Sequence, residues 1–228
     1  MRPISGSVWA GRKAREAPGS EKKPAIILPG LTIKEATRDS RVIRIALANL
    51  LMASVGSGVS VHLVRIVSET GISMDTAVEI AATAGLAGLI GKVGVGWLLD
   101  RVQGSLIPFS GFAIGAFGHF LLIGLIGGAT PLLIGAMCIG FASGAGLQIS
   151  TYLISRYAGL RNFGAIFGTI SSMMMAGTAL GPMFAGAVHD LTGSYDILEM
   201  IAAPVMLLCA TLFVGLGPYP EFARPEQD

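Results

Sequence analysis

The stretch GLAGLIGKVGVGWLLDRVQGS, residues 85–105, is the part of the sequence that most clearly sets the fold class. It is apolar and rich in glycine, carries the lysine Lys92 well inside it, and ends in Asp100, Arg101 and a short turn. Small residues of this kind let membrane helices approach one another closely. The stretch therefore predicts a transmembrane helix that packs tightly on its neighbours and ends at a cytoplasmic loop.

Composition extends this interpretation to the whole chain of 228 residues. Hydrophobic residues make up 52% and charged residues 13%, with a mean hydropathy of +0.69. Soluble domains carry about 25% charged residues. Apolar runs of membrane length recur along the chain. We therefore predict an all-α membrane protein with six spans, at 42–67, 76–99, 106–127, 131–155, 163–188 and 197–216.

Charge predicts the orientation of these spans. Residues 1–44 hold ten Lys/Arg and four Asp/Glu, a balance of +6, whereas residues 45–228 hold six and ten, a balance of −4. A basic tail also suits nucleic-acid binding, but it lacks interleaved aromatic residues, and membrane helices follow it directly. The positive-inside rule then predicts that both termini are cytoplasmic. The basic loop residues Arg101, Arg156, Arg161 and Arg224 fall on the same side as the tail, and Glu69, Asp75, Asp190 and Asp196 fall on the other.

The same patterns divide the chain into three parts. Residues 1–41 form a cytoplasmic basic tail, expected to be partly disordered with a short amphipathic helix near 31–41. Residues 42–216 form the transmembrane domain, and residues 217–228 form a cytoplasmic C-terminal tail. Within the domain, Gly96 to Asp100 and Gly186 to Asp190 share a GxxxD pattern three spans apart. This spacing predicts 3+3 inverted repeats, the plan of many secondary transporters.

These residues resemble the major facilitator superfamily, and specifically its C-terminal six-helix half. Gly96, Leu98, Asp100 and Arg101 match the motif that follows the second helix of each half, although Gln103 stands where that motif has glycine. The segment from Gly177 through Gly181, Pro182 and Gly186 to Asp190 is similar to the eleventh helix of the monocarboxylate and oxalate/formate porter-like branch. The resemblance covers about residues 31–216.

The resemblance implies a secondary transporter in the plasma (inner) membrane that moves a small organic anion, such as a monocarboxylate, by alternating access. The family has twelve spans and this chain has six. Besides the bilayer and the substrate, the resemblance therefore implies one further partner, which is either a missing N-terminal half or a second copy of the chain. The alternative is a truncated, non-transporting membrane protein or a regulatory subunit that docks on a full transporter.

Several residues are candidates for the transport site. Lys92 is costly inside a membrane helix and is expected to pair with a substrate carboxylate, although structural pairing or snorkelling to the surface is the competing explanation. The full set of candidates is substrate binding by Lys92, Gln148, Thr151 and Tyr152; gating or motif roles for Gly96, Asp100, Arg101, Gly181, Pro182, Gly186 and Asp190; and an external mouth at His62, Arg65 and Glu79.

Other polar residues are expected to have simpler roles. His119 is interpreted as a hydrogen-bonded packing residue, and Glu79 and Glu199 as residues solvated at the outer interface. Cys138 and Cys209 lie in apolar runs and are expected to pack as small side chains. The sequence contains no nucleophile–base pair, metal-ligand cluster or phosphate loop, so we predict neither an enzyme nor a cofactor, and no nucleic-acid partner.

Overall fold

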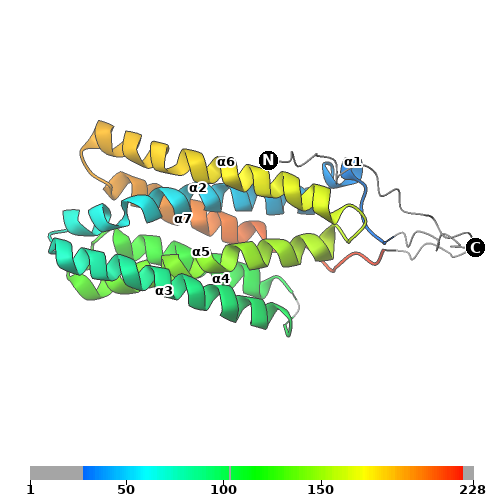
Figure 1. Ribbon diagram of the computed structural model, residues 1–228, viewed down its shortest axis with the longest axis horizontal. Coiled ribbons are helices and arrows are strands. Elements are labelled where there is room, and N and C mark those ends of the chain that lie inside the picture. The colour runs from blue at the N-terminus through cyan, green and yellow to red at the C-terminus, as the bar shows by residue number, and fades with distance from the viewer. Residues whose placement is uncertain (1–27, 103, 223–228) are drawn as a thin grey trace, which may run out of the picture.

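The computed structural model describes residues 28–102 and 104–222, and its regular structure there is helical (Figure 1). A single turn, α1 (Ile33–Ala36), precedes six longer helices. Thr32 and Glu35 cap this turn reciprocally. It lies inside the segment predicted as a short amphipathic helix, whereas residues 1–27 of the predicted tail lie outside the described residues. The six helices are α2 (Ser40–Glu69), α3 (Met74–Leu99), α4 (Leu106–Leu122), α5 (Ala129–Tyr157), α6 (Phe163–Thr192) and α7 (Asp196–Leu212).

Each predicted span coincides with one of these helices, but two of the helices are shorter than predicted. By length and composition, α2, α3, α5 and α6 can cross a membrane, and α4 is a shorter apolar helix. Both α4 and α7 have 17 residues, about 25 Å of helix. Glycines end them early: Gly124 follows α4 with a φ of 77°, and Gly215 follows α7 with a φ of 70°. Such left-handed conformations terminate a helix.

The six helices run alternately up and down, so their connections gather at two ends (Figure 1). The α3–α4 and α5–α6 connections lie at the same end as the start of α2 and the end of α7, on the right of the figure. Arg101, Arg156 and Arg161 are at this end. Glu69, Asp75 and Asp190 belong to the opposite end. The helical arrangement therefore places these three arginines at one end and these three acidic residues at the other, with Arg65 at the acidic end and Asp100 at the basic end as exceptions.

The helices pack in the order α6, α2, α5, α3, with α7 and α4 against the middle pair. The closest packing is between α3 and α5 and between α2 and α6. In addition, α4 packs on α5, α7 packs on α2, and α4 packs on α7. This pattern is unchanged when the first three long helices are exchanged with the last three, because α3–α5 becomes α6–α2 and α4–α5 becomes α7–α2.

Glycines make the two closest crossings possible. A Cβ atom at Gly144 would collide with the carbonyl oxygen of Gly88, across the α3–α5 contact. A Cβ atom at Gly177 would lie 2.8 Å from the carbonyl oxygen of Leu50, across the α2–α6 contact. The GxxxG pairs Gly140/Gly144 and Gly177/Gly181 therefore each serve one of these two contacts, as small residues do in membrane helix pairs.

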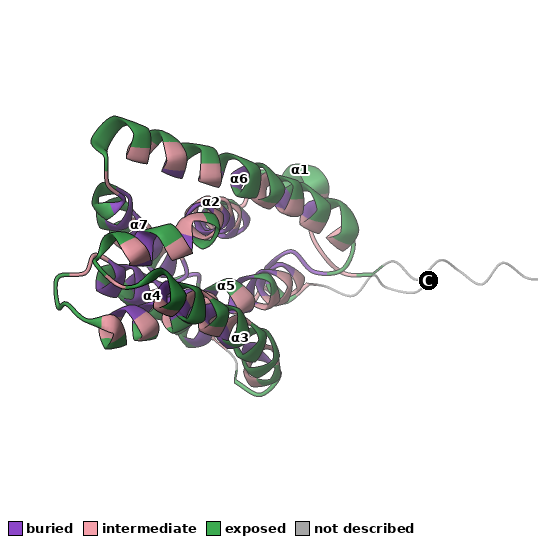
Figure 2. Cartoon of the chain, turned by 60° about the vertical axis from the view of Figure 1, so that its left-hand side comes forward, coloured by how far each residue is buried: buried purple, intermediate pink, exposed green. Residues whose placement is uncertain are grey.

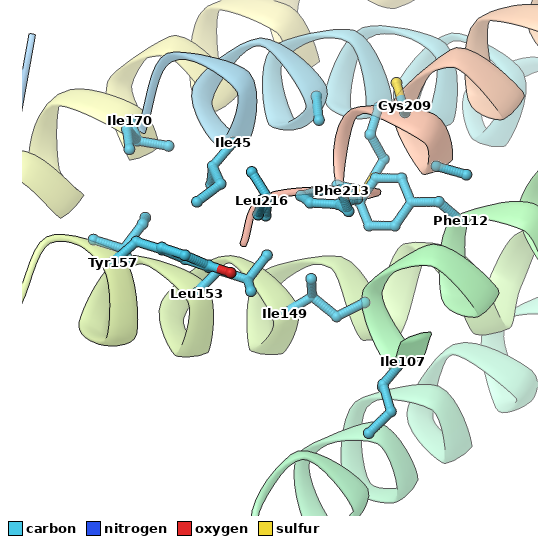
Figure 3. Close-up of a cluster of buried hydrophobic side chains, with 14 of the residues drawn as sticks. Ile45, Ile107, Phe112, Ile149, Leu153, Tyr157, Ile170, Cys209, Phe213 and Leu216 are labelled. Carbon is cyan, nitrogen blue, oxygen red and sulfur yellow. The ribbon is translucent and has the colours of Figure 1, made fainter. Parts of the chain in front are cut away.

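The core lies between α2, α5 and α7 (Figure 3). Phe112 of α4 packs edge-on against Phe213, with ring centroids 4.9 Å apart. A polar contact also crosses this core, where the hydroxyl of buried Ser150 donates to the side-chain oxygen of buried Asn49. Helices α6 and α3, at the two ends of the row, are the least buried (Figure 2). Their exposed faces carry large apolar side chains, among them Leu89, Val93, Leu180, Met183 and Phe184.

Candidate functional site

Lys92 lies on α3 in a row with two glycines that face α5. A Cβ atom at Gly88, one turn earlier, would lie 3.1 Å from the carbonyl oxygen of Gly140. A Cβ atom at Gly96, one turn later, would lie 3.7 Å from Cγ of Gln148. Residues four apart lie on the same face of a helix. The structure thus brings the rows that carry Lys92 and Gln148 alongside each other at the α3–α5 contact.

The Lys92 side chain is exposed and makes no hydrogen bond or ion pair with any residue that the structure describes. Gln148 beside it is half-buried. Thr151 turns its hydroxyl back onto its own helix, donating to the carbonyl oxygen of Leu147 at 2.9 Å. Of the four predicted substrate residues, Lys92 and Gln148 are therefore the two with polar groups left available at this contact.

Tyr152 belongs instead to an aromatic cluster at the basic end of the helices. Its hydroxyl lies 3.3 Å from the hydroxyl of Tyr219, in the segment after α7. The backbone N–H of Gly104, after α3, donates to the same Tyr219 hydroxyl at 3.0 Å. The guanidinium of Arg156 stacks over both tyrosine rings, at 5.3 Å and 5.6 Å. Tyr219 therefore ties the C-terminal segment to two helix ends, a role that the sequence pattern did not reveal.

The predicted gating residues occupy the end of α3 and the length of α6. Asp100 caps α3 and is exposed, and the guanidinium of Arg101 stacks 3.8 Å over the Trp97 ring. Asp100 makes no ion pair among the residues of the described part. On α6, Gly181 meets α2 closely, whereas a Cβ atom at Gly186 would find open space. Pro182 lies inside α6, and Asp190 is exposed near its end.

At the acidic end, His62 forms a network with residues of α6 and α7. Its Nε2 lies 3.3 Å from the carbonyl oxygen of Pro182, and its Nδ1 lies 2.9 Å from the hydroxyl of Tyr195. A carbonyl oxygen only accepts, so Nε2 carries the hydrogen in the contact with Pro182. Burial raises the pKa of that tyrosine hydroxyl. The network joins α2 to the start of α7.

Arg65 and Glu79, predicted with His62 as an external mouth, lie in different surroundings. Nε of Arg65 donates to Oε1 of Glu69 at 3.3 Å, and Nε2 of His189 lies 3.1 Å from the same oxygen. The His189 ring packs on Tyr195 with centroids 4.5 Å apart, so Arg65 and His62 belong to one cluster. Exposed Glu79 lies apart from it, in a small cavity of about 250 Å³ between α3 and the start of α5.

His119 and Glu199 form a buried pair that corrects the interpretation of Glu199. Nδ1 of His119 and Oε2 of Glu199 are 2.8 Å apart, and each side chain is 1% exposed. His119 is thus hydrogen-bonded within the core, in agreement with its predicted packing role. Glu199, which was expected to be solvated at the interface, is instead covered because α7 turns this position toward α4.

Comparison with known proteins assigns the family. The profile of the Major Facilitator Superfamily matches residues 45–228. Monocarboxylate transporter 13 of Bos taurus is 25% identical over 204 residues, covering 89% of this chain and 48% of that protein. Human monocarboxylate transporter 12 is 25% identical over 171 residues, covering 74% of this chain and 33% of that protein.

A bacterial relative extends the comparison. The gallate transporter of Pseudomonas putida is 24% identical over 164 residues, covering 62% of this chain and 36% of that protein. The chain thus spans between a third and a half of the length of these three relatives. With its apolar helices of membrane length, it is an integral, multi-pass membrane protein that belongs to the major facilitator superfamily and resembles its monocarboxylate transporters.

Proposed function

We propose that this chain is the C-terminal six-helix half of a secondary transporter that moves small organic anions, such as monocarboxylates, by alternating access. The observation that carries this proposal is Lys92. A lysine inside a membrane helix costs roughly 2.5–3.5 kcal/mol on insertion scales, and the described residues offer it no counter-ion. A carboxylate substrate would supply that missing charge.

The helix pairing supports the six-helix plan. Exchange of α2–α3–α4 with α5–α6–α7 preserves every major contact, which is what two repeats of three helices require. The GxxxG pair on α5 permits the close α3–α5 contact, and the pair on α6 permits the close α2–α6 contact, which the exchange converts into each other. Under this plan α4 and α7 also span the bilayer, because 17 residues are at the lower limit for crossing it.

Charge supports an orientation with both termini cytoplasmic, in the plasma membrane. Arg101, Arg156 and Arg161 lie at the end where the described chain begins and finishes. Cytoplasmic loops carry the excess of Lys and Arg. In this orientation the Tyr219 cluster lies on the cytoplasmic side, and the His62 cluster lies at the outer surface.

The exposed apolar faces of α3 and α6 support the proposal that a second six-helix unit packs against this one. These two helices end the row and are the least buried, although their glycine-lined faces pack closely on α5 and α2. The relatives are two to three times as long as the matched region. The partner is therefore an N-terminal six-helix half, or a second copy of this chain, that faces the row and completes the cavity beside Lys92.

The names of the relatives support the class of cargo. Two are monocarboxylate transporters and one is a gallate transporter, so a carboxylate is common to the named cargoes. Lys92 would bind that carboxylate as a point charge, with Gln148 as a neighbouring hydrogen-bond donor. In the proposed cycle Asp100 and Arg101, at the cytoplasmic end of α3, have a gating role when the two halves move. Gly181 and Pro182 have the same role on α6, as do Gly186 and Asp190 nearer the outer end of that helix.

Uptake of labelled monocarboxylates and gallate into proteoliposomes tests the role of Lys92. A charge-assisted bond contributes about 1.5–3 kcal/mol, so Lys92→Gln should lower uptake about tenfold to a hundredfold. Lys92→Arg should retain a measurable part of it. The matched control is Lys34→Gln, which removes an exposed lysine from α1 outside the spans and should leave uptake unchanged. Unchanged uptake in the Lys92→Gln protein would remove Lys92 from the site.

A further inference from the structure

An apolar groove of about 340 Å³ lies where α1 meets the starts of α2 and α6, at the basic end of the helices (Figure 1). Val42, Ile166 and Ile170 line it and are buried in the hydrophobic core, so they form its floor. Ile33 of α1 and Ile43 of α2 also line it and are 54% and 49% exposed. The groove therefore continues the core outward to a surface that the described residues leave uncovered.

The lining of the groove is suited to a hydrocarbon chain. Its two polar residues are Thr37 and Thr169, and the other side chains that line it are apolar. The hydroxyl of Thr37 donates to the carbonyl oxygen of Lys34 at 3.0 Å, and that of Thr169 donates to the carbonyl oxygen of Ala165 at 2.9 Å. Polar ligands are oriented by donors and acceptors placed around them. Both hydroxyl hydrogens are used within the chain here, which favours an apolar occupant.

The chain around the groove is basic. Residues 31–44 together with Arg161 hold five Lys/Arg and two Asp/Glu, a balance of +3. Both acids serve as helix caps, because Glu35 belongs to the reciprocal cap of α1 and Asp39 caps the start of α2. Neither carboxylate forms an ion pair with a described residue. The positive charge beside the groove is therefore not neutralised within the described part of the chain.

Three of the cations are placed to meet an anion at the mouth of the groove. The side chains of Lys34, Arg38 and Arg161 are exposed and form no ion pair with any residue that the structure describes. Lys34 and Arg38 each follow directly after a residue that lines the groove. Arg161 lies beside the segment that leads into α1, because a Cβ atom at Gly30 would be 2.9 Å from its backbone nitrogen.

The depth of the groove matches the boundary between headgroups and acyl chains. It extends from α1 to Leu47, about 10 Å along α2 from the start of that helix at Ser40. Amphipathic segments at a membrane surface bury their apolar side about 5–10 Å into this boundary. In the proposed orientation the groove opens at the cytoplasmic leaflet, which carries anionic lipids that attract Lys and Arg.

We propose that this groove binds an anionic phospholipid, with an acyl chain between α1, α2 and α6 and the phosphate facing Lys34, Arg38 and Arg161. Arginine suits this role because its guanidinium can donate two parallel hydrogen bonds to a phosphate. The choice of leaflet rests on the proposed orientation, whereas binding itself is independent of the proposed cargo and of Lys92. The bound lipid fastens α1 to the bilayer at the start of the first span.

The experiment is thermal unfolding of the full chain in a neutral detergent with one of three additions. These are phosphatidylglycerol, phosphatidylcholine with the same acyl chains, and inorganic phosphate. A ligand that binds the folded state raises the melting temperature, by about 3–6 °C at a concentration about ten times its dissociation constant. Phosphatidylglycerol should give such a rise, phosphatidylcholine a smaller one and inorganic phosphate none, because the site requires both the chain and the charge.

Variants separate the two parts of the site. The combined changes Lys34→Gln, Arg38→Gln and Arg161→Gln alter exposed side chains and should remove most of the excess of phosphatidylglycerol over phosphatidylcholine. Ala46→Leu adds bulk to the groove from α2 and should reduce the rise with phosphatidylglycerol. Arg65→Gln is the matched control, because it removes an exposed arginine at the opposite end of the helices, and it should keep the excess.

Four results would overturn the proposal. Equal rises with the two phospholipids would mean that charge plays no part, and an equal rise with inorganic phosphate would indicate a simple anion site. An excess that survives both the triple variant and Ala46→Leu would place the lipid elsewhere. No rise with either lipid would mean that another part of the protein, or a second copy, covers the groove. Because no cargo is present, failure of transport would leave this result unaffected.

The uptake control remains valid beside this site. Liposomes offer lipid in large excess, and Lys34→Gln removes one of three cations, so the groove stays occupied in that variant.

Discussion

At the scale of single residues, the ionisable residues inside the helices differ in whether they have an ionisable partner. Glu199 has His119, Arg65 has Glu69, and Lys92 has none among the described residues. The sequence identified Lys92 because a cation in an apolar run is conspicuous without any knowledge of the fold. It could not pair His119 with Glu199, because the two residues are 80 positions apart and their contact depends on how α4 and α7 are rotated.

Tyr219 gives a prediction at this scale. Its hydroxyl accepts the N–H of Gly104 and lies beside the hydroxyl of Tyr152, so Tyr219→Phe should lower the free energy of unfolding by about 1 kcal/mol at neutral pH. Burial, reinforced by Tyr152, raises the pKa of Tyr219 to about 12. A free tyrosine titrates at about 10.

The sign of the Tyr219 effect follows from those two values. Between about pH 10 and 12 the folded chain keeps a proton that the unfolded chain releases, so this contribution to stability is complete below pH 10 and is lost as pH rises. Thermal unfolding at pH 8 to 11 should show a steeper alkaline loss for the wild type than for Tyr219→Phe. Equal slopes would mean that the hydroxyl is not held in this cluster.

At the scale of elements, apolar run length located all six long helices, because a span needs about 20 apolar residues whatever it packs against. Their ends were less predictable. The spans predicted to finish at Gly127 and Leu216 end as helices at Leu122 and Leu212, where glycines take left-handed conformations. The glycine-rich stretch at residues 85–105 predicted a closely packed helix, but it could not say which helix would meet it.

The α3–α5 contact gives a prediction about an element. A side chain at Gly144 would meet the backbone of Gly88, which cannot move aside without separating the helices. Gly144→Ala should therefore lower the free energy of unfolding by about 1–3 kcal/mol. Gly94, on the same helix as Gly88, has open space around it, so Gly94→Ala should be neutral or stabilising.

Thermal unfolding of the two alanine variants in one detergent provides the comparison. A Gly144→Ala protein as stable as the Gly94→Ala protein would show that α3 and α5 do not approach as closely as described.

At the scale of the whole molecule, the chain presents a row of four helices with two more behind it. The row ends in two exposed helices, α6 and α3, and carries Lys92, which forms no ion pair with any described residue. An isolated six-helix protein would gain little from such a face, whereas a half that closes on another half requires one. The Gly181–Pro182 segment indicated the resemblance to monocarboxylate transporters, whereas the repeat plan inferred from GxxxD stays a prediction. The identity of the proposed partner could not be predicted, because the sequence of one chain does not contain the surface that another chain would present.

The most direct test is uptake of labelled monocarboxylate into proteoliposomes that contain the chain alone or together with its N-terminal six-helix counterpart. The proposal predicts saturable uptake in at least one of these arrangements, and loss of that uptake with Lys92→Gln. Absence of uptake in both, with the chain inserted and associated with its counterpart, would contradict the transport function and leave a non-transporting regulatory subunit.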